Sequence, residues 1–395
     1  MSISKIIETY MQQSSWIRKM FEEGGKLKAQ FGKDNVYDFS LGNPNLAPPK
    51  VFRETLLHLI EEPLPMAHAY MPNAGDMEAR DAIAAYVSTE QDISLTANEI
   101  IMTCGAAGGL NVVFKTLLEP GDEVIVPSPY FVEYGFYVSN HQGTLQPVNT
   151  HSDFSLNIEA IAEKMNSKTK AVLINSPNNP TGRLYSKEQL MALGELLREK
   201  SNQLNRTLYL ITDEPYRKIV FDKKTVPSVF SCYTETIFVT SYSKDLSIPG
   251  ERIGFIAVHP QSTHKNRLIG GMTLANRILG FVNAPALMQR AVARLQGVSV
   301  DIKQYESKRD RICQGLSSCG YDFIRPDGAF YLFPKSPIPD DVVFVNALLN
   351  ERILAVPGRG FGAPGYFRLA FCVDDQTIQN AMPGFGKVMQ QILKK

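Results

Sequence analysis

The stretch from about residue 99 to residue 258 alternates short β-rich runs with helical segments. Such alternation requires crossover connections between strands, so it favours an α/β fold with a mostly parallel sheet. Runs rich in Ile, Val and Leu predict strands at 99–105, 123–129, 144–149, 171–177, 208–215, 236–243 and 252–258. The spacing of apolar residues predicts helices at 108–118, 132–140, 158–165 and 186–204.

The segments on either side of this stretch predict a second, smaller unit. Their patterns indicate helices at 1–35, 51–60 and 285–316, and short strands at 330–333 and 367–371. The length of the chain suits more than one domain. We therefore expect a large domain at 46–288 and a smaller α/β domain made of 1–45 and 289–395.

Composition and charge argue against several classes of protein. Lys and Arg number 41 against 40 Asp and Glu, which disfavours a protein built to coat nucleic acid or an acidic membrane. No apolar run approaches the roughly 18 residues of a membrane-spanning helix, and the first residues lack the apolar stretch of a signal peptide. The five cysteines are widely spaced, without a CxxC pair, so no metal site is expected. Free thiols favour a cytoplasmic protein.

Polar and aromatic residues follow the ends of the predicted strands. In parallel α/β sheets, ligands bind in the crevice beyond the carboxyl ends of the strands. The segments found there are Gly105 to Ala107, Pro129 to Phe131, Asn178 to Pro180, Asp213 to Tyr216, and Ser241 to Lys244. The sequence therefore predicts a ligand site built from these segments.

Lys244 and Asp213 are the first candidates for catalysis. A lysine after a β-rich run in apolar surroundings loses solvation, which lowers its pKa and frees the amine to form a Schiff base. The alternative is a solvated surface lysine. Asp213 ends an apolar strand, where a carboxylate either caps a helix or pairs with a protonated ring nitrogen. Tyr216 either points its phenol at the same ligand or packs in the core.

A candidate phosphate site follows the first strand. The small residues at 105–109 lead from a strand into a helix, which leaves backbone N–H groups free for a phosphate, or they form a tight turn that binds nothing. Arg252, Ser241 and Ser243 offer a charge and two hydroxyls to the same phosphate. The G-x-G-x-x-G match at 360–365 precedes a strand-like run instead of a helix, so we interpret it as a turn.

Four motifs together resemble one family. They are SYSKDLSIPGERIG (241–254), SPNNPTG (176–182), TDEPY (212–216), and VPGRGFG with FRLAF (356–371). In this order they resemble the class I/II aminotransferases of fold type I, aspartate aminotransferase-like enzymes that depend on pyridoxal 5′-phosphate (PLP). The resemblance covers Gly42 to about Phe371. It implies a three-layer sandwich and a transaminase (EC 2.6.1 class) that moves an amino group from an L-amino acid to a 2-oxo acid through a Lys244 Schiff base.

The resemblance also implies roles for individual residues. The catalytic residues are Lys244 as general base and acid, Asp213 beside the pyridinium nitrogen, and Tyr216. Phe131 stacks on the ring in preference to Tyr130 or Tyr134. The other cofactor-binding residues are Gly105, Ala106, Ala107, Ser241, Ser243 and Arg252 at the phosphate, and Asn179 with Tyr216 at the phenolic oxygen. The substrate α-carboxylate is bound by Arg368, Asn179 and the backbone of Gly42.

Some alternatives stay open at this point. Tyr70 resembles the tyrosine that reaches the phosphate of a neighbouring subunit, which implies a homodimer with shared sites, but it also suits a surface loop. The same motifs suit a PLP-dependent lyase (a C–S β-lyase or an aminocyclopropane-carboxylate-synthase-like enzyme) or, less well, a PLP-sensing domain of a regulator. Arg277, Asn283, Arg359 and the loop of Tyr70 are candidates for reading the substrate side chain. An arginine facing the pocket would indicate dicarboxylic substrates such as aspartate or glutamate.

Overall fold

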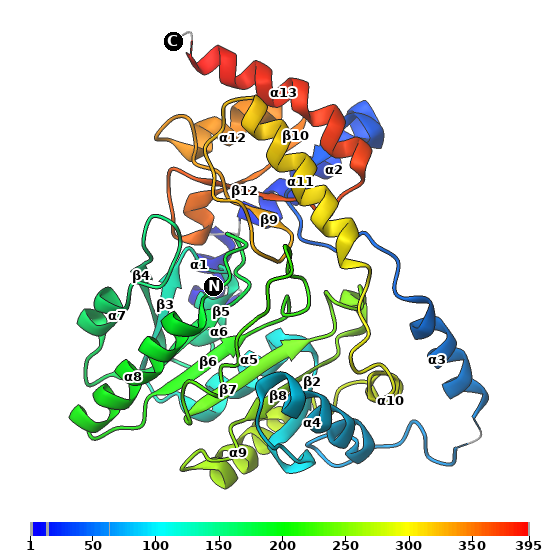
Figure 1. Cartoon of the computed structure of the whole chain (residues 1–395), viewed down its shortest axis with the longest axis vertical. Coiled ribbons are helices and arrows are strands. Elements are labelled where there is room, and N and C mark those ends of the chain that lie inside the picture. Colours follow the sequence, from blue (N-terminus) through cyan, green and yellow to red (C-terminus); the bar gives the residue numbers. More distant parts are fainter. Residues whose placement is uncertain (1–2, 13–15, 63, 394–395) are drawn as a thin grey trace.

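A seven-stranded sheet forms the centre of the protein in a computed structural model that describes residues 3–12, 16–62 and 64–393 (Figure 1). The strand order is β2-β8-β7-β6-β5-β3-β4. β8 runs antiparallel to its neighbours β2 and β7, and the other neighbouring pairs are parallel. The bounds are β2 (Ile100–Thr103), β3 (Glu123–Ser128), β4 (Thr144–Asn149), β5 (Thr169–Asn175), β6 (Tyr209–Asp213), β7 (Thr236–Ser241) and β8 (Gly254–Val258). The predicted mostly parallel sheet is confirmed.

Helices cover both faces of this sheet, which makes a three-layer sandwich (Figure 1). Successive strand residues point to opposite faces. On β5, Val172 joins a core with α3, α4, α8 and α10, whereas Leu173 joins a core with α5, α6 and α9. The bounds are α3 (Lys50–Glu61), α4 (Met77–Gln91), α5 (Gly105–Leu117), α6 (Glu133–Ser139), α7 (Ile158–Lys164), α8 (Lys187–Gln203), α9 (Lys265–Ile278) and α10 (Ala286–Ala293).

A smaller unit has its own apolar core. Its sheet has the order β11-β12-β9 and packs with α11, α12 and α13, while β1 pairs with β10 and so joins the N-terminal segment to the C-terminal part. The bounds are α2 (Trp16–Phe31), β1 (Tyr37–Asp38), α11 (Ile302–Ser318), β9 (Tyr331–Leu332), α12 (Asp341–Asn350), β10 (Ile353–Leu354), β11 (Val356–Pro357), β12 (Phe367–Ala370) and α13 (Asp375–Leu393). The first helix, α1 (Lys5–Gln12), instead contacts α6, where its Tyr10 ring meets Phe136. The domain limits at residues 46 and 288 stay a prediction.

The prediction of one continuous helix at 285–316 is wrong. The chain forms two helices, α10 and α11, with a break between them. Gly297 in the break has a φ of 79°, a left-handed conformation that glycine adopts without steric cost. Asp301 then starts α11, because its side chain accepts a hydrogen bond from the Lys303 backbone N–H. Apolar spacing stays helical on both sides of the break, so the pattern alone did not reveal it.

The G-x-G-x-x-G segment at 360–365 is a turn, as predicted. The 3-10 helix η4 (Gly358–Phe361) is followed by Gly362 with a φ of 76°, and β12 comes next. Within the described ranges, no helix is long and apolar enough to cross a membrane. The same ranges contain no group of three or more His, Cys, Asp or Glu side chains that could hold a metal ion.

Candidate active site

A cavity of about 330 Å³ lies at the carboxyl ends of β3, β5, β6 and β7. The smaller unit completes its wall through Leu41, Gly42, Tyr331 and Arg368. Most of the predicted site residues line it, namely Gly42, Ala106, Ala107, Phe131, Asn179, Asp213, Tyr216, Ser241, Ser243, Lys244, Arg252 and Arg368. The topology therefore brings together segments that are far apart in the sequence.

Lys244 follows β7 and points its amine into this cavity. Its Nζ donates a 2.9 Å hydrogen bond to the carbonyl oxygen of Gly42. Burial lowers the pKa of Lys244 to about 8, and the positive charges of Arg252 and Arg368 act in the same direction. A large share of the amine is therefore neutral near pH 8, as a nucleophile or a base requires.

Asp213, the last residue of β6, has one carboxylate oxygen in use and one free. Oδ2 accepts a 2.6 Å hydrogen bond from Tyr134, while Oδ1 is buried and has no hydrogen-bond partner among the described residues. Burial raises the pKa of Asp213 to about 7, although the Tyr134 hydrogen bond lowers it. A buried acceptor without a partner is costly. It fits a cationic N–H donor such as a pyridinium nitrogen, which would favour the charged carboxylate.

The start of α5 forms an anion cradle with Arg252. Gly105 opens the helix with a φ of 73°, and a Cβ at this position would lie 2.7 Å from Arg252 Nη2, so glycine leaves the guanidinium its place. The first turn of the helix then carries Ala106 and Ala107 into the cavity wall. Free N–H groups of a first turn, next to an arginine, suit a phosphate.

Two hydroxyls complete this end of the cavity. Ser241 Oγ donates a 3.1 Å hydrogen bond to Ser243 Oγ, and both side chains line the wall beside Lys244. Phe131 lines the wall that follows β3 and meets Tyr134 edge to face, with ring centroids 5.5 Å apart. Since Tyr134 is bonded to Asp213 and Tyr130 does not line the cavity, Phe131 is the aromatic residue best placed to cover a ring.

Arg368 on β12 is fully buried, with one donor unused. Nη1 donates to Asn179 Oδ1 at 3.0 Å and Nη2 to the Ser40 carbonyl at 2.6 Å, whereas Nε finds no partner in the described part of the chain. The guanidinium lies 4.7 Å from the ring centroids of both Tyr331 and Phe361. No carboxylate neutralises it within these contacts, so it is prepared to bind an anionic substrate group.

Two tyrosines of the site were not identified from sequence in their observed roles. Tyr331 Oη lies 2.8 Å from Tyr216 Oη, and Tyr134 holds Asp213. Tyr331 was predicted only as part of a strand, and Tyr134 only as a rival for ring stacking. Both contacts join residues far apart in the chain, so no local pattern could have indicated them.

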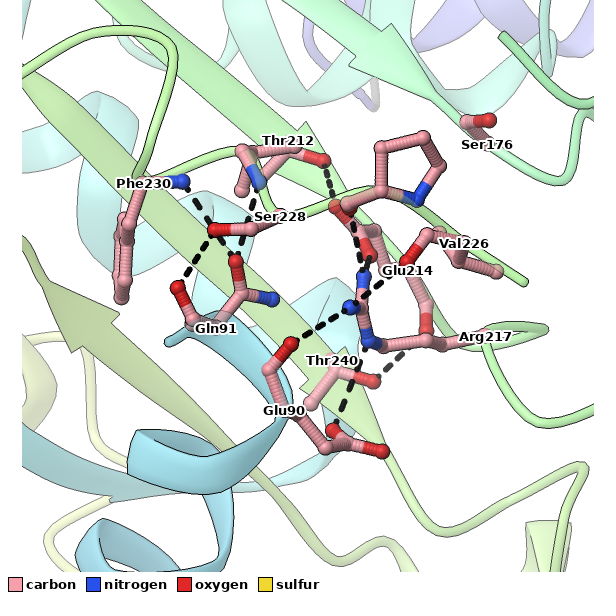
Figure 2. A network of polar contacts seen from close by, with 12 residues as sticks. Glu90, Gln91, Ser176, Thr212, Glu214, Arg217, Val226, Ser228, Phe230 and Thr240 are labelled. Carbon is pink, nitrogen blue, oxygen red and sulfur yellow. Dashed lines mark hydrogen bonds and ion pairs between the residues drawn. The ribbon is translucent and has the colours of Figure 1, made fainter. Parts of the chain in front are cut away.

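A buried polar network holds the segment that carries Asp213 and Tyr216 (Figure 2). The Glu214 carboxylate accepts hydrogen bonds from Thr212 Oγ1 and from Arg217 Nη1, each at 2.6 Å. Arg217 also donates to the Glu90 carbonyl at 3.3 Å, which ties the segment to the end of α4. Thr240 Oγ1 donates to the Glu214 carbonyl at 2.9 Å and links β7 to the same segment. The loop after β6 is thus fixed from three sides.

A family model described as "Aminotransferase class I and II" matches residues 34–384. The chain belongs to this family. The family depends on PLP, so the protein is a PLP-dependent aminotransferase that moves an amino group from an L-amino acid to a 2-oxo acid. The lyase alternative is not favoured.

Similar proteins agree with this assignment. The chain is 31% identical over 354 residues to a probable aspartate aminotransferase of Methanocaldococcus jannaschii. The matched region covers 87% of this chain and 91% of that protein. A solved aminotransferase structure from Eubacterium rectale superposes with a TM-score of 0.96 at 38% identity, covering 99% of both chains. The aspartate aminotransferase of Thermus thermophilus with maleate has a TM-score of 0.87 at 27% identity, covering 98% of this chain and 100% of the other.

Several predicted residues lie outside the cavity of the aminotransferase. Tyr70 is 90% exposed. Arg359 pairs with Asp340 and Asp341 at 2.8 and 2.7 Å, and Arg277 is exposed on α9. Neither arginine lines the cavity. The same is true of Asn283, whose Nδ2 donates to the Pro72 carbonyl at 2.9 Å.

Proposed function

We propose that this cavity is where the aminotransferase binds PLP and exchanges the amino group, with Lys244 as the residue that moves protons. The observation that supports this most strongly is the buried, unpartnered Oδ1 of Asp213 in the cavity that also holds the Lys244 amine. A cavity with a free buried acceptor, an anion cradle and a lysine of lowered pKa matches the chemical groups of PLP.

Each group of PLP has candidate partners in the wall. Asp213 would accept the ring N–H, and Phe131 would cover the ring face. The phosphate would be held by Gly105, Ala106, Ala107, Ser241, Ser243 and Arg252, and the phenolic oxygen by Asn179 and Tyr216. PLP, when bound, supplies an electron sink for the pair of electrons left behind when the substrate loses its α-proton.

The protein's own side chains bind the amino acid substrate and transfer its protons. Arg368 binds the α-carboxylate through its unused Nε and its Nη groups, and this fixes the α-carbon relative to Lys244. The Lys244 amine would take the α-proton and return a proton to the cofactor carbon on the other side of the amino nitrogen. Asp213 stays charged beside the ring nitrogen and keeps that nitrogen protonated. Because the first product, a 2-oxo acid, leaves without the amino group before the second substrate binds, ping-pong kinetics are expected.

We also propose a homodimer with shared active sites. Tyr70 lies in an exposed loop with the apolar side chains Leu64 and Met66, which are 45% and 81% exposed. Exposed apolar side chains grouped in one loop are a mark of an interface. Mixing inactive Tyr70→Ala and Lys244→Ala chains tests this, since a mixed dimer would contain one complete site and regain activity. No regained activity after subunit exchange would count against shared sites.

The domain division and the cellular location remain part of this proposal. We propose 46–288 as the large PLP-binding domain, with 1–45 and 289–395 as the small one, because the smaller unit has a separate core that joins both ends of the chain. All five cysteines are free thiols, which supports a cytoplasmic location.

Visible absorption of the purified protein tests the proposed site. We expect a yellow band with PLP that fades when an L-amino acid is added alone and returns when a 2-oxo acid follows. Lys244→Ala should still bind PLP but show no such cycle. Protein that stays colourless with added PLP, or a Lys244→Ala variant that cycles normally, would overturn the proposal.

A further inference from the structure

Tyr331 lines the cavity and has no assigned role so far. It opens β9, which pairs with β12 so that Tyr331 lies opposite Ala370. Residues two positions apart on a strand share a face, so Tyr331 and Arg368 are diagonal neighbours on one face of this sheet. The guanidinium of Arg368 lies 4.7 Å from the centroid of the Tyr331 ring. The register of the small sheet therefore places this ring against the arginine that is proposed to bind the substrate α-carboxylate.

The hydroxyl of Tyr331 contacts segments that come from elsewhere in the chain. Its oxygen lies 2.8 Å from Tyr216 Oη, and the two rings meet edge to face with centroids 5.6 Å apart. A Cβ at residue 42 would overlap Tyr331 Oη, so this close approach requires Gly42. The carbonyl of Gly42 in turn accepts the hydrogen bond from Lys244. One hydroxyl is thus packed between the segment that holds the reactive lysine and the tyrosine proposed for the phenolic oxygen of PLP.

The number of protons determines how these two phenols can act together. Each phenol has one proton to donate and an oxygen that accepts. Burial keeps both phenols protonated, because it raises the pKa of Tyr331 to about 12 and that of Tyr216 well above its usual value. When Tyr216 gives its proton to the phenolic oxygen of PLP, Tyr331 has to be the donor in the 2.8 Å contact.

The other titratable groups near the two phenols stay in place when the Tyr331 hydroxyl is removed. They are Arg368 near both phenols, Asp213 and Lys244 near Tyr216, and Cys372 near Tyr331. A change in proton affinity after Tyr331→Phe can therefore be assigned to the lost hydroxyl.

We propose that Tyr331 is a positioning residue for both ends of the site: its hydroxyl directs the Tyr216 proton at the phenolic oxygen of PLP, and its ring supports the Arg368 guanidinium. This inference rests on the proposed function of the cavity. In a chain of two hydrogen bonds each bond strengthens the other, so the Tyr331 hydroxyl makes Tyr216 a better donor. Tyr331 takes no proton from the substrate. Because the hydroxyl and the ring have different partners, substitutions can separate their effects.

The pH dependence of the visible band of the PLP-loaded protein tests the role of the hydroxyl without any turnover. A hydrogen bond donated to the phenolic oxygen favours its charged form, so it lowers the pH at which the linkage between Lys244 and PLP loses its proton. Tyr216→Phe should raise this midpoint by about one pH unit, and Tyr331→Phe should raise it by about 0.3 units. The double variant should have the midpoint of Tyr216→Phe and no higher, because Tyr331 acts through Tyr216.

The KM for the amino donor tests the role of the ring. Tyr331→Leu removes the ring together with the hydroxyl, so KM should rise about tenfold, whereas Tyr331→Phe keeps the ring and should raise KM less than about twofold. Tyr321→Phe is the matched control. Tyr321 is a buried tyrosine of the smaller unit that does not line the cavity, and its hydroxyl donates to the Phe385 carbonyl at 3.1 Å. This control should leave both the midpoint and KM unchanged.

The outcomes separate this inference from the proposed function. An unshifted midpoint in Tyr331→Phe would overturn the role of the hydroxyl. The same holds for a double variant whose midpoint exceeds that of Tyr216→Phe by the full shift seen in Tyr331→Phe. Equal KM values in Tyr331→Leu and Tyr331→Phe would overturn the role of the ring. A wild-type protein that shows no visible band after PLP is added would instead count against the proposed site itself.

Discussion

Tyr134 donates a 2.6 Å hydrogen bond to Oδ2 of Asp213 and leaves Oδ1 of the same carboxylate without a partner among the described residues. The first oxygen anchors the carboxylate, and the second is free for a ligand. Both residues are buried, so the hydrogen bond and the free oxygen lie in a low-dielectric environment. A protonated ring nitrogen therefore fits beside Oδ1, the oxygen that Tyr134 does not contact.

Replacing Asp213 should remove most of the activity. In Asp213→Asn the amide offers no negative charge to hold the ring nitrogen protonated, so we expect the half-reaction to slow by roughly 10²–10⁴-fold. Stopped-flow absorbance of the PLP band after adding an amino acid measures this rate. Tyr134→Phe is the control. It removes only the anchor and should cost about tenfold. If both variants lost the same amount of half-reaction rate, the hydrogen bond from Tyr134, and not the negative charge of Asp213, would account for the loss.

The sequence was sufficient to predict which segments meet at the cavity when each segment directly follows a β-rich run. Lys244 and Asp213 each follow a β-rich run, and the parallel topology carries the ends of such runs to one crevice. Arg368 was assigned by resemblance, and its buried position with an unused donor is consistent with that assignment. For each of these residues, its type and its position relative to a strand were enough to predict that it lies in the cavity wall.

The rest depends on contacts between distant segments. Tyr216 and Tyr331 meet across 115 positions, and Tyr134 reaches Asp213 across 79, so only the packed fold shows these pairs.

The lowered pKa of Lys244 predicts how PLP reloading depends on pH. Burial lowers this pKa from 10.5 to about 8, so the reactive neutral amine is scarce below pH 8 and dominant above it. Reconstitution of the apoprotein with PLP should therefore accelerate about tenfold for each pH unit between 6 and 8 and level off above 8. Absorbance at the PLP band follows the reaction. A rate still rising tenfold between pH 9 and 10 would indicate an unperturbed lysine.

Arg368 should be irreplaceable even by another cation. In Arg368→Lys a single ammonium replaces a planar fork, and the contacts to Asn179 and Ser40 are not reproduced. We expect the KM for the amino donor to rise roughly 30-fold or more, with PLP binding retained. Arg359→Lys is the control, since Arg359 pairs with Asp340 and Asp341 outside the cavity. If both variants had similar KM values, Arg368 would not be the residue that binds the substrate α-carboxylate.

The ion pair between Glu214 and Arg217 (Figure 2) should matter for stability because Glu214 is buried and the Arg217 side chain is only 9% exposed. Glu214→Gln removes the charge that Arg217 Nη1 contacts at 2.6 Å and leaves a largely buried guanidinium whose remaining carboxylate partner, Glu90, is more distant at 3.5 Å. Removing one partner of a buried pair is strongly destabilising, so the free energy of unfolding should fall by about 3 kcal/mol. Urea denaturation of the apoprotein measures this change.

An exposed pair provides the comparison for this prediction. Glu54 pairs with Lys50 at 3.2 Å on the surface of α3, with side chains 54% and 91% exposed, so Glu54→Gln should leave the urea midpoint unchanged within error. The double variant Glu214→Gln with Arg217→Met should recover part of the loss, because it removes the unpaired charge as well. If Glu214→Gln were as stable as Glu54→Gln, the network would not hold the loop after β6, and the position of Asp213 would have to be fixed by strand pairing with β5 and β7 and by its contacts with Tyr134 and Asn175.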